Sequence, residues 1–212
     1  MMKRLFARAV LALSAFLAVS PSFAAGEGLP PDELVRTVTS EVLTIIRSDK
    51  AIQSGDFGKM LALVDEKVLP HFDFRRMTSL AVGRDWRSAS PAQQERLTTA
   101  FRTLLVRTYS NALIQYRDQT TEVKPLRANP GDKRVRVNTE VRMPGAKPIT
   151  IDYSLEQGGA AWKVFDVTVA GVSLVTNYRG SFGDEISAKG IDGLIASLEA
   201  KNKSLEAAQG GK

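Results

Sequence analysis

The chain has 212 residues, with no cysteine, one histidine and a formal net charge of +6. The lack of cysteine excludes disulfides and thiolate chemistry, and a single histidine argues against a structural zinc site or a multi-histidine metal site. We therefore predict no metal and no cofactor, and a domain stabilised by its apolar core alone.

Residues 1–24 have the pattern of a signal peptide. Three basic residues precede an apolar run over residues 9–19, and small residues follow at Ser22 and Ala24. The run is shorter than the ~20 residues that a membrane span needs, so we expect cleavage after Ala24 and a soluble mature chain. Cleavage lowers the formal charge from +6 to +3. This mild excess does not favour nucleic acid as a partner, but it suits an anionic head group or an acidic surface.

The first half of the mature chain has the apolar periodicity of helices. One helix is predicted from Pro30-Pro31 to about Asp49, and a second from its cap at Asp56 to Pro70. Asp73 is predicted to cap a brief third helix.

The clearest helix signal begins at residues 90–93. Ser90 caps, Pro91 takes the first helical position and Gln93 completes a capping box, so a helix is predicted to about Tyr116. Residues 83–89, just before it, are expected to form a polar loop anchored by a tryptophan.

The second half changes to strand periodicity. Alternating apolar and polar residues predict four strands, over residues 120–126, 134–142, 149–155 and 162–169. The short turn-rich connections between them predict an antiparallel meander.

After Ala170-Gly171 the last strand is predicted to turn straight into a helix capped by Ser173. Gly190 should end that helix, Asp192 should cap a final one, and residues 207–212 should form a frayed, flexible tail.

The order of helices, sheet and helices predicts a single α+β domain over residues 25–206, with helices covering one face of an antiparallel sheet. This layout resembles the cone of ketosteroid isomerase, in which a lone aspartate abstracts a proton. His71, Asp152 and Asp166 are the candidate catalytic residues. We favour non-catalytic readings of all three: a half-buried loop position for His71, a solvent-facing position for Asp152 and a structural hydrogen-bonding role for Asp166.

Basic residues are scattered over loops and solvent faces, where they form a solvated surface or the rim of a phosphate site. They are Arg75, Arg76, Arg84, Arg87, Lys133, Arg134, Arg136 and Arg179.

Three segments carry a resemblance to a known family. They are Trp-x-Val-x-Asp-x-x-x-x-Gly-Val-Ser-Leu-Val-x-Asn-Tyr-Arg-x-x-Phe over residues 162–182, Val-Leu-Pro-His-Phe-Asp-Phe-x-x-Met over residues 68–77, and Gly-Arg-x-Trp-Arg-x-Ala over residues 83–89. This pattern resembles the MlaC family of periplasmic phospholipid carriers, also called toluene-tolerance proteins. The resemblance covers nearly all of the mature chain.

The resemblance implies a periplasmic carrier that shuttles glycerophospholipid to maintain outer-membrane lipid asymmetry. It implies two partners, an outer-membrane lipoprotein–porin complex and an inner-membrane ABC transporter. We expect a monomer without nucleic-acid binding, stable membrane insertion or catalysis. The alternatives are an exported interaction protein with a filled core and an enzyme on the cone.

The family further implies that acyl chains lie in an internal apolar cavity between sheet and helices. On that reading, two rows of apolar side chains line the cavity instead of packing on each other: the helical row from the helices, and the sheet row from the strands. The candidate lipid-binding residues are Phe72, Phe74, Met77, Leu80, Val82, Phe101, Leu104, Leu105, Tyr109, Val135, Val137, Val141, Ile149, Ile151, Tyr153, Phe165, Val167, Val169, Val172 and Val175.

Overall fold

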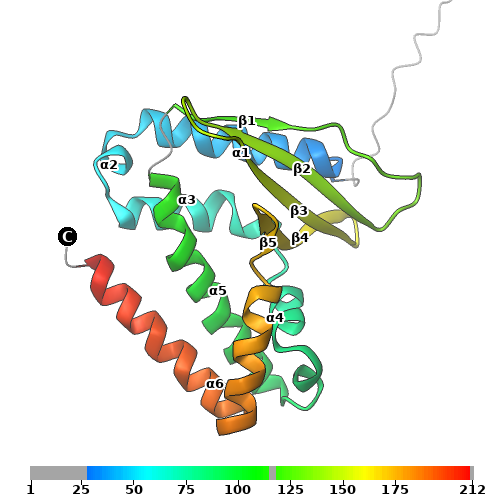
Figure 1. The fold of residues 1–212 in the computed structure, drawn as a ribbon, viewed down its shortest axis with the longest axis vertical. Helices are drawn as coiled ribbons and strands as arrows, with labels where there is room; N and C mark the ends of the chain where they lie inside the picture. The colour runs from blue at the N-terminus through cyan, green and yellow to red at the C-terminus, as the bar shows by residue number, and fades with distance from the viewer. Residues whose placement is uncertain (1–27, 115–117, 211–212) are drawn as a thin grey trace, which may run out of the picture.

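The computed structural model describes residues 28–114 and 118–210, which excludes the predicted signal peptide and the predicted helix end near Tyr116. Helices precede and follow a sheet (Figure 1). The helices are α1 (Pro31–Ser48), α2 (Lys50–Gln53), α3 (Phe57–Lys67), α4 (Phe74–Val82), α5 (Pro91–Ile114) and α6 (Arg179–Gly210). The strands are β1 (Thr120–Val123), β2 (Arg134–Arg142), β3 (Ile149–Gly158), β4 (Ala161–Val169) and β5 (Val172–Ser173). Short 3₁₀ segments are η1 (Leu69–His71), η2 (Gly83–Arg87) and η3 (Thr176–Tyr178).

Three of the predicted helix starts are confirmed at the level of hydrogen bonds. The carboxylate of Asp56 accepts from the Lys59 amide at 3.0 Å, and that of Asp73 accepts from the Arg76 amide at 2.8 Å. The capping box of residues 90–93 is reciprocal, because each residue's backbone amide donates to the other's side chain. These caps satisfy amides that have no partner within the helix.

The five strands form an antiparallel sheet in the order β1-β2-β3-β4-β5, so the predicted meander is confirmed but its count of four strands is wrong. The missed strand is β5. Ala170 and Gly171 both have positive φ, 48° and 85°, which makes a tight hairpin turn instead of a strand-to-helix corner. β1 also ends at Val123, three residues earlier than predicted.

Ser173 therefore lies in a strand and does not start α6 directly. Its hydroxyl accepts from the Thr176 amide at 3.0 Å, so it gives a partner to the first amide of the 3₁₀ turn η3, which leads into α6. The predicted break at Gly190 is confirmed, since this glycine has φ 72° and ψ 179° inside α6. Beyond the break, α6 continues through Gly210. The predicted tail is therefore helical over residues 207–210, where Gln209 exchanges hydrogen bonds with Arg107.

A β-bulge changes the register between β3 and β4. Ser154 lies opposite Asp166, whereas Leu155 lies opposite Val164, so Phe165 is the extra residue. Val164 takes the buried position with 3% exposure, and Phe165 is only half-buried. Val169 is also half-buried, but it packs on the sheet cluster around Val164 and Val167, whereas Phe165 is not among the side chains packed on that cluster.

The outer edge of β4 is covered by two short segments. β5 pairs with its second half, and Phe72 forms a parallel bridge to Val164 in its first half. The Asp73 amide also donates to the Val164 carbonyl at 2.9 Å. Covering the edge in this way removes unpaired backbone groups that would otherwise pair with another chain.

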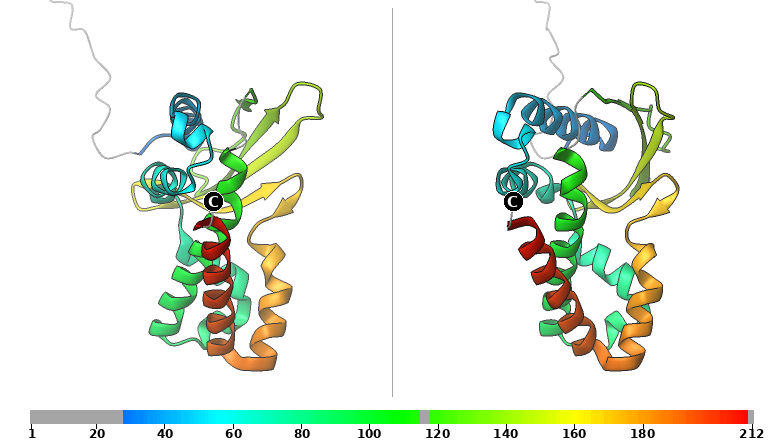
Figure 2. Two further views of the ribbon diagram at one scale, coloured as in Figure 1. Left: turned by 90° about the vertical axis from the view of Figure 1, so that its left-hand side faces the viewer. Right: turned by 60° about the vertical axis from the view of Figure 1, so that its left-hand side comes forward.

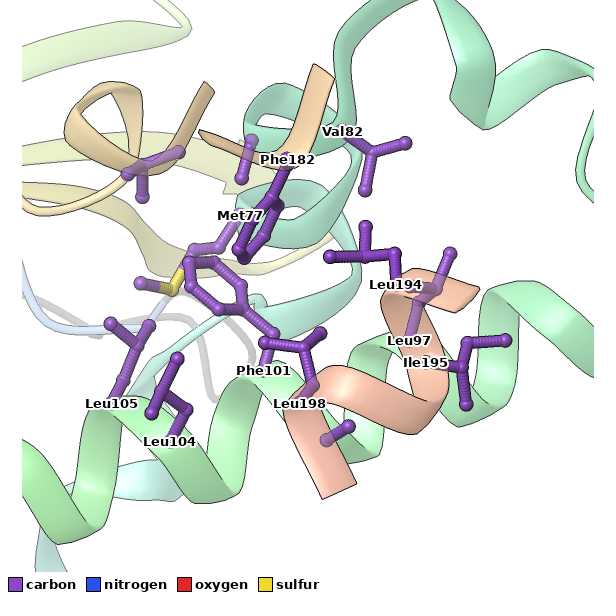
Figure 3. Close-up of a cluster of buried hydrophobic side chains, with 13 residues drawn as sticks. Met77, Val82, Leu97, Phe101, Leu104, Leu105, Phe182, Leu194, Ile195 and Leu198 are labelled. Carbon is purple, nitrogen blue, oxygen red and sulfur yellow. The ribbon is translucent and has the colours of Figure 1, made fainter. Parts of the chain in front are cut away.

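Buried apolar side chains form three clusters. In the sheet cluster, Leu34 and Val35 of α1 pack on Val137, Leu155 and Val164 of the sheet. In the helical cluster, α4, α5 and α6 pack on one another (Figure 3). A third cluster joins α1, α2 and α3 to the C-terminal half of α5. Because α5 runs from the helical cluster to the third cluster, it ties the two ends of the molecule together (Figure 2).

Candidate functional site

The predicted helical row lies in a closed core. Met77, Val82, Phe101, Leu104, Leu105 and Val175 are all buried in the helical cluster, with Phe74 and Leu80 packed against it. Figure 3 shows Met77, Phe101 and Phe182 close together between α4, α5 and α6. Most of the helical row therefore packs within the helical cluster, and Phe72 is the member that also packs on the sheet cluster.

Three aromatic rings fill the centre of the helical cluster. Phe101 meets Tyr178 and Phe182 edge-on, with ring centroids 5.2 Å apart in each pair. Burial, together with the neighbouring Tyr109 hydroxyl, raises the pKa of Tyr178 to about 12. Tyr109 itself is 36% exposed, so it lies at the margin of the cluster.

The predicted sheet row contributes to a separate cluster. Val137 is fully buried and Val167 is 8% exposed, whereas Val135, Ile151, Tyr153 and Val169 are only half-buried against the same cluster. Two further predictions fall outside all three clusters, the buried Val141 and the half-buried Ile149. Val172 is 54% exposed on the short edge strand β5, so it is not part of an internal wall.

Phe72 joins the two predicted rows. It is half-buried and packs against both the helical and the sheet clusters. Its ring stacks on Phe74, with centroids 5.7 Å apart and planes 19° apart. The adjacent residues Leu174 and Val175 also lie where the two clusters meet. Leu174 packs on the sheet cluster, and Val175 packs in the helical cluster.

The half-buried apolar side chains around the sheet cluster define the candidate site. We call them the sheet-side apolar surface, which comprises Phe72, Ile151, Tyr153, Val169 and Leu174. The strand members share one face, because Tyr153 lies opposite Val167, and Ile151 lies opposite Val169. An incompletely covered apolar face of this kind gains free energy when an apolar ligand covers it. Sequence reasoning missed Leu174, which it assigned to a helix.

A hollow of about 330 Å³ lies elsewhere, between α5 and α6. Its lining includes the charged side chains of Arg96, Glu199 and Lys203, and Arg96 is paired with Glu199 at 3.0 Å. It shares no residue with the sheet-side apolar surface. We therefore do not assign the apolar ligand to it.

The candidate catalytic aspartates are both occupied by structural hydrogen bonds. Asp166 accepts from the Ser173 hydroxyl at 2.7 Å and from the Val175 amide at 3.3 Å. Asp152 accepts from the Asn138 side-chain amide at 2.8 Å. Asp166 thus ties β4 to the segment that leads into the helical cluster, as the predicted hydrogen-bonding role requires.

An Asp166→Ala variant is expected to lose about 1–3 kcal/mol of unfolding free energy, because the Val175 amide and Ser173 hydroxyl lose their acceptor. Urea denaturation measures this loss. Asp152→Ala is the matched control on the neighbouring strand, where the bond to exposed Asn138 is replaceable by water. Equal losses in the two variants would contradict the structural role of Asp166.

His71 lies in η1 at the junction between α3 and α4. Burial, and then the positive charge of Lys163, lower the pKa of His71 below its ordinary 6.5. The fold therefore favours the neutral ring, and this contribution is fully present above pH 6.5 and lost as pH falls through the lowered pKa.

When pH falls from about 7 to about 5, a range that spans the ordinary histidine pKa, a His71→Gln variant should lose less unfolding free energy than the wild type. Thermal unfolding at both pH values measures the difference. Parallel pH dependence in the two proteins would show that His71 makes no such contribution.

Within residues 28–114 and 118–210, no group of three or more His, Asp or Glu side chains is placed to hold a metal ion. No helix in the same residues is both long and apolar enough to cross a bilayer. The fold and the site thus define an α+β protein whose antiparallel sheet presents a partly exposed apolar face.

The chain belongs to the MlaC protein family, whose model matches residues 36–200. The toluene tolerance protein ttg2D of Pseudomonas putida is 28% identical over 163 residues, which are 76% of this chain and 75% of the relative. The intermembrane phospholipid transport system binding protein MlaC of Haemophilus influenzae is 24% identical over 203 residues, 93% of this chain and 92% of the relative.

A solved structure extends the comparison. The phospholipid-binding protein from Ralstonia solanacearum, in complex with a phospholipid, matches with a TM-score of 0.79 at 37% identity. The match covers 84% of this chain and 99% of that chain. The α+β fold predicted from sequence is confirmed by this likeness.

Proposed function

We propose that the protein is a periplasmic carrier that binds a glycerophospholipid and transfers it between membranes. The observation that carries this proposal is the phospholipid held by the Ralstonia solanacearum protein, whose fold this chain matches over 84% of its length. The name of one curated relative agrees, since the Haemophilus influenzae protein is an intermembrane phospholipid transport system binding protein.

The acyl chains are assigned to the sheet-side apolar surface. Its strand members, Ile151, Tyr153 and Val169, are half-buried, and Phe72 and Leu174 flank them from the helical side. The helical row, centred on Phe101, acts in this proposal as the rigid wall behind Phe72. The proposed lipid contacts are therefore fewer than those expected from sequence. They lie on the sheet and at its junction with the helices.

The energetics suit exchange in either direction. Burying ~30 methylene groups at ~0.8 kcal/mol each is worth about 24 kcal/mol relative to water. A bilayer offers the lipid almost the same gain, so the net free energy of transfer is small. The protein then acts kinetically, by removing the water-exposed intermediate, and needs neither a catalytic group nor a cofactor other than its cargo.

The proposal includes export and two membrane partners. Signal-peptide removal after Ala24 would leave a mature chain that starts close to Gly28, whose amide donates to the Ala160 carbonyl at the turn between β3 and β4. The partners are an outer-membrane lipoprotein–porin complex and an inner-membrane ABC transporter. We propose that the protein meets them as a monomer.

Transfer between vesicles tests the proposal. Donor vesicles containing a fluorescent, self-quenched phosphatidylethanolamine are mixed with unlabelled acceptor vesicles and the mature protein. We expect dequenching at a rate proportional to protein concentration. A rate equal to that without protein, at every concentration, would reject the carrier function.

A further inference from the structure

Four arginines gather around the short 3₁₀ helix η2, and we call them the η2 arginine patch: Arg75, Arg84, Arg87 and Arg179. Arg84 and Arg87 are three residues apart. Since a 3₁₀ helix has three residues per turn, both side chains leave the same side of η2. Both residues are exposed, and the Arg84 side chain is 88% exposed.

Arg179, at the start of α6, lies against the turn that begins η2. A Cβ atom placed on Gly83 would be 3.5 Å from Arg179 Nε. Gly83 also has φ 72°, a conformation that glycine adopts most readily. The glycine thus turns the chain into η2, and the Arg179 guanidinium lies in contact distance of that turn.

Arg75, in the first turn of α4, is fixed against η2 by two contacts. Its guanidinium carbon lies 5.3 Å from the centre of the Trp86 ring, and its Nη2 donates to Gln94 Oε1 at 2.5 Å. The Gln94 amide donates in turn to the Trp86 carbonyl at 2.9 Å. One glutamine side chain therefore holds both Arg75 and the η2 backbone.

The charge of this patch is poorly compensated within the described residues. Its closest ion-pair contact is weak, between Arg84 Nε and Asp85 Oδ1 at 4.0 Å. Basic residues elsewhere have closer carboxylates, such as Arg134 with Glu156 at 2.7 Å and Arg102 with Asp65 at 2.6 Å. The described structure thus leaves a group of guanidinium ions facing solvent, of which Arg75 is held in place by Trp86 and Gln94.

We propose that the η2 arginine patch docks an acidic protein surface on a partner. Planar guanidinium groups bind carboxylates through paired hydrogen bonds, and those that are already held in place lose little entropy on binding. A membrane surface would require only charge density. The segment between α4 and α5 lies at the helical end of the molecule, away from the sheet (Figure 1). Docking there leaves the sheet-side apolar surface uncovered, and the inference does not depend on the cargo.

A labelled oligoglutamate peptide serves as the probe, with binding followed by fluorescence anisotropy at low salt. The combined variant Arg84→Gln, Arg87→Gln, Arg179→Gln should bind roughly tenfold more weakly, as expected for three exposed ion pairs. The matched control is the combined variant Lys133→Gln, Arg136→Gln, Lys147→Gln. It removes the same charge from exposed residues in β2 and the loops beside it, so it should bind the peptide like the wild type.

The Gln94→Leu variant tests whether the arrangement of the arginines matters, separately from the net charge. It changes no charge but frees Arg75 and η2, so the peptide should bind several-fold more weakly, while circular dichroism verifies the fold. Equal weakening in the two charge variants would overturn the proposal, as would no binding of the peptide by the wild type. Patch-dependent binding to vesicles containing phosphatidylglycerol, with no binding of the peptide, would overturn it in favour of a membrane surface.

Discussion

A Phe101→Ala variant is expected to lose about 3–5 kcal/mol of unfolding free energy, the usual cost of removing a large buried aromatic side chain. Phe101 is fully buried at the centre of the helical cluster, where its ring contacts Tyr178 and Phe182. Substitution leaves a cavity that neighbours on three helices cannot all close. Guanidinium denaturation measures the loss.

Tyr109→Ala is the matched control on the same helix. Tyr109 is 36% exposed, so its truncation removes less buried area and should cost clearly less than that of Phe101. If Phe101→Ala were as mild as Tyr109→Ala, the helical cluster would not be a closed core. The helical row would then return to consideration as a cavity wall.

An Ile151→Asp variant is expected to lose its phospholipid. Ile151 is half-buried in the centre of the sheet-side apolar surface, opposite Val169. A carboxylate there would be desolvated by acyl chains at a cost of several kcal/mol, so lipid retention should fall by at least about a hundredfold. Mass spectrometry under native conditions gives the bound fraction directly.

Thr150→Asp is the matched control for that experiment. Thr150 is the preceding residue of β3, exposed on the opposite side of the sheet, and receives the same charge. It should retain lipid as the wild type does. Full lipid occupancy in folded Ile151→Asp would remove β3 from the proposed site. Substitution of fully buried Val137 would be less informative, because unfolding alone would release the lipid.

Local signals in the sequence predicted most of the fold. The caps at Asp56 and Asp73, the capping box of residues 90–93 and the break at Gly190 depend on interactions within a few residues. Such interactions are visible in a short window of sequence. The alternation of β2 and β3 likewise predicted which side of the sheet is buried.

Features that depend on register or tertiary packing were not predictable in the same way. The bulge at Phe165 shifts the pairing of β4 by one residue. The two consecutive apolar residues there, Val164 and Phe165, are equally compatible with a strand that is apolar on both faces. The tight turn at Ala170-Gly171 is compatible with a corner or a hairpin, and only pairing with β4 selects the hairpin. Consecutive residues Leu174 and Val175 enter different clusters because the chain passes between the sheet and the helices there.

The resemblance to a lipid-carrier family supplied the ligand class, but it did not divide core from ligand surface. Apolar side chains look alike in both roles. We propose that burial in the folded chain separates them, since Phe101 and Val137 are fully buried while Ile151 and Phe72 are partly exposed. The candidate site is accordingly smaller than the apolar rows from which it was predicted.

The most direct test of the carrier function is native mass spectrometry of the mature protein purified from the periplasm, with organic extraction of the same sample. The proposal predicts a mass increment equal to one phospholipid, and recovery of that phospholipid in the extract. A protein that carries no lipid, and takes up none from phospholipid vesicles, would contradict it. The sheet-side apolar surface would then be part of the core or an interface with another protein.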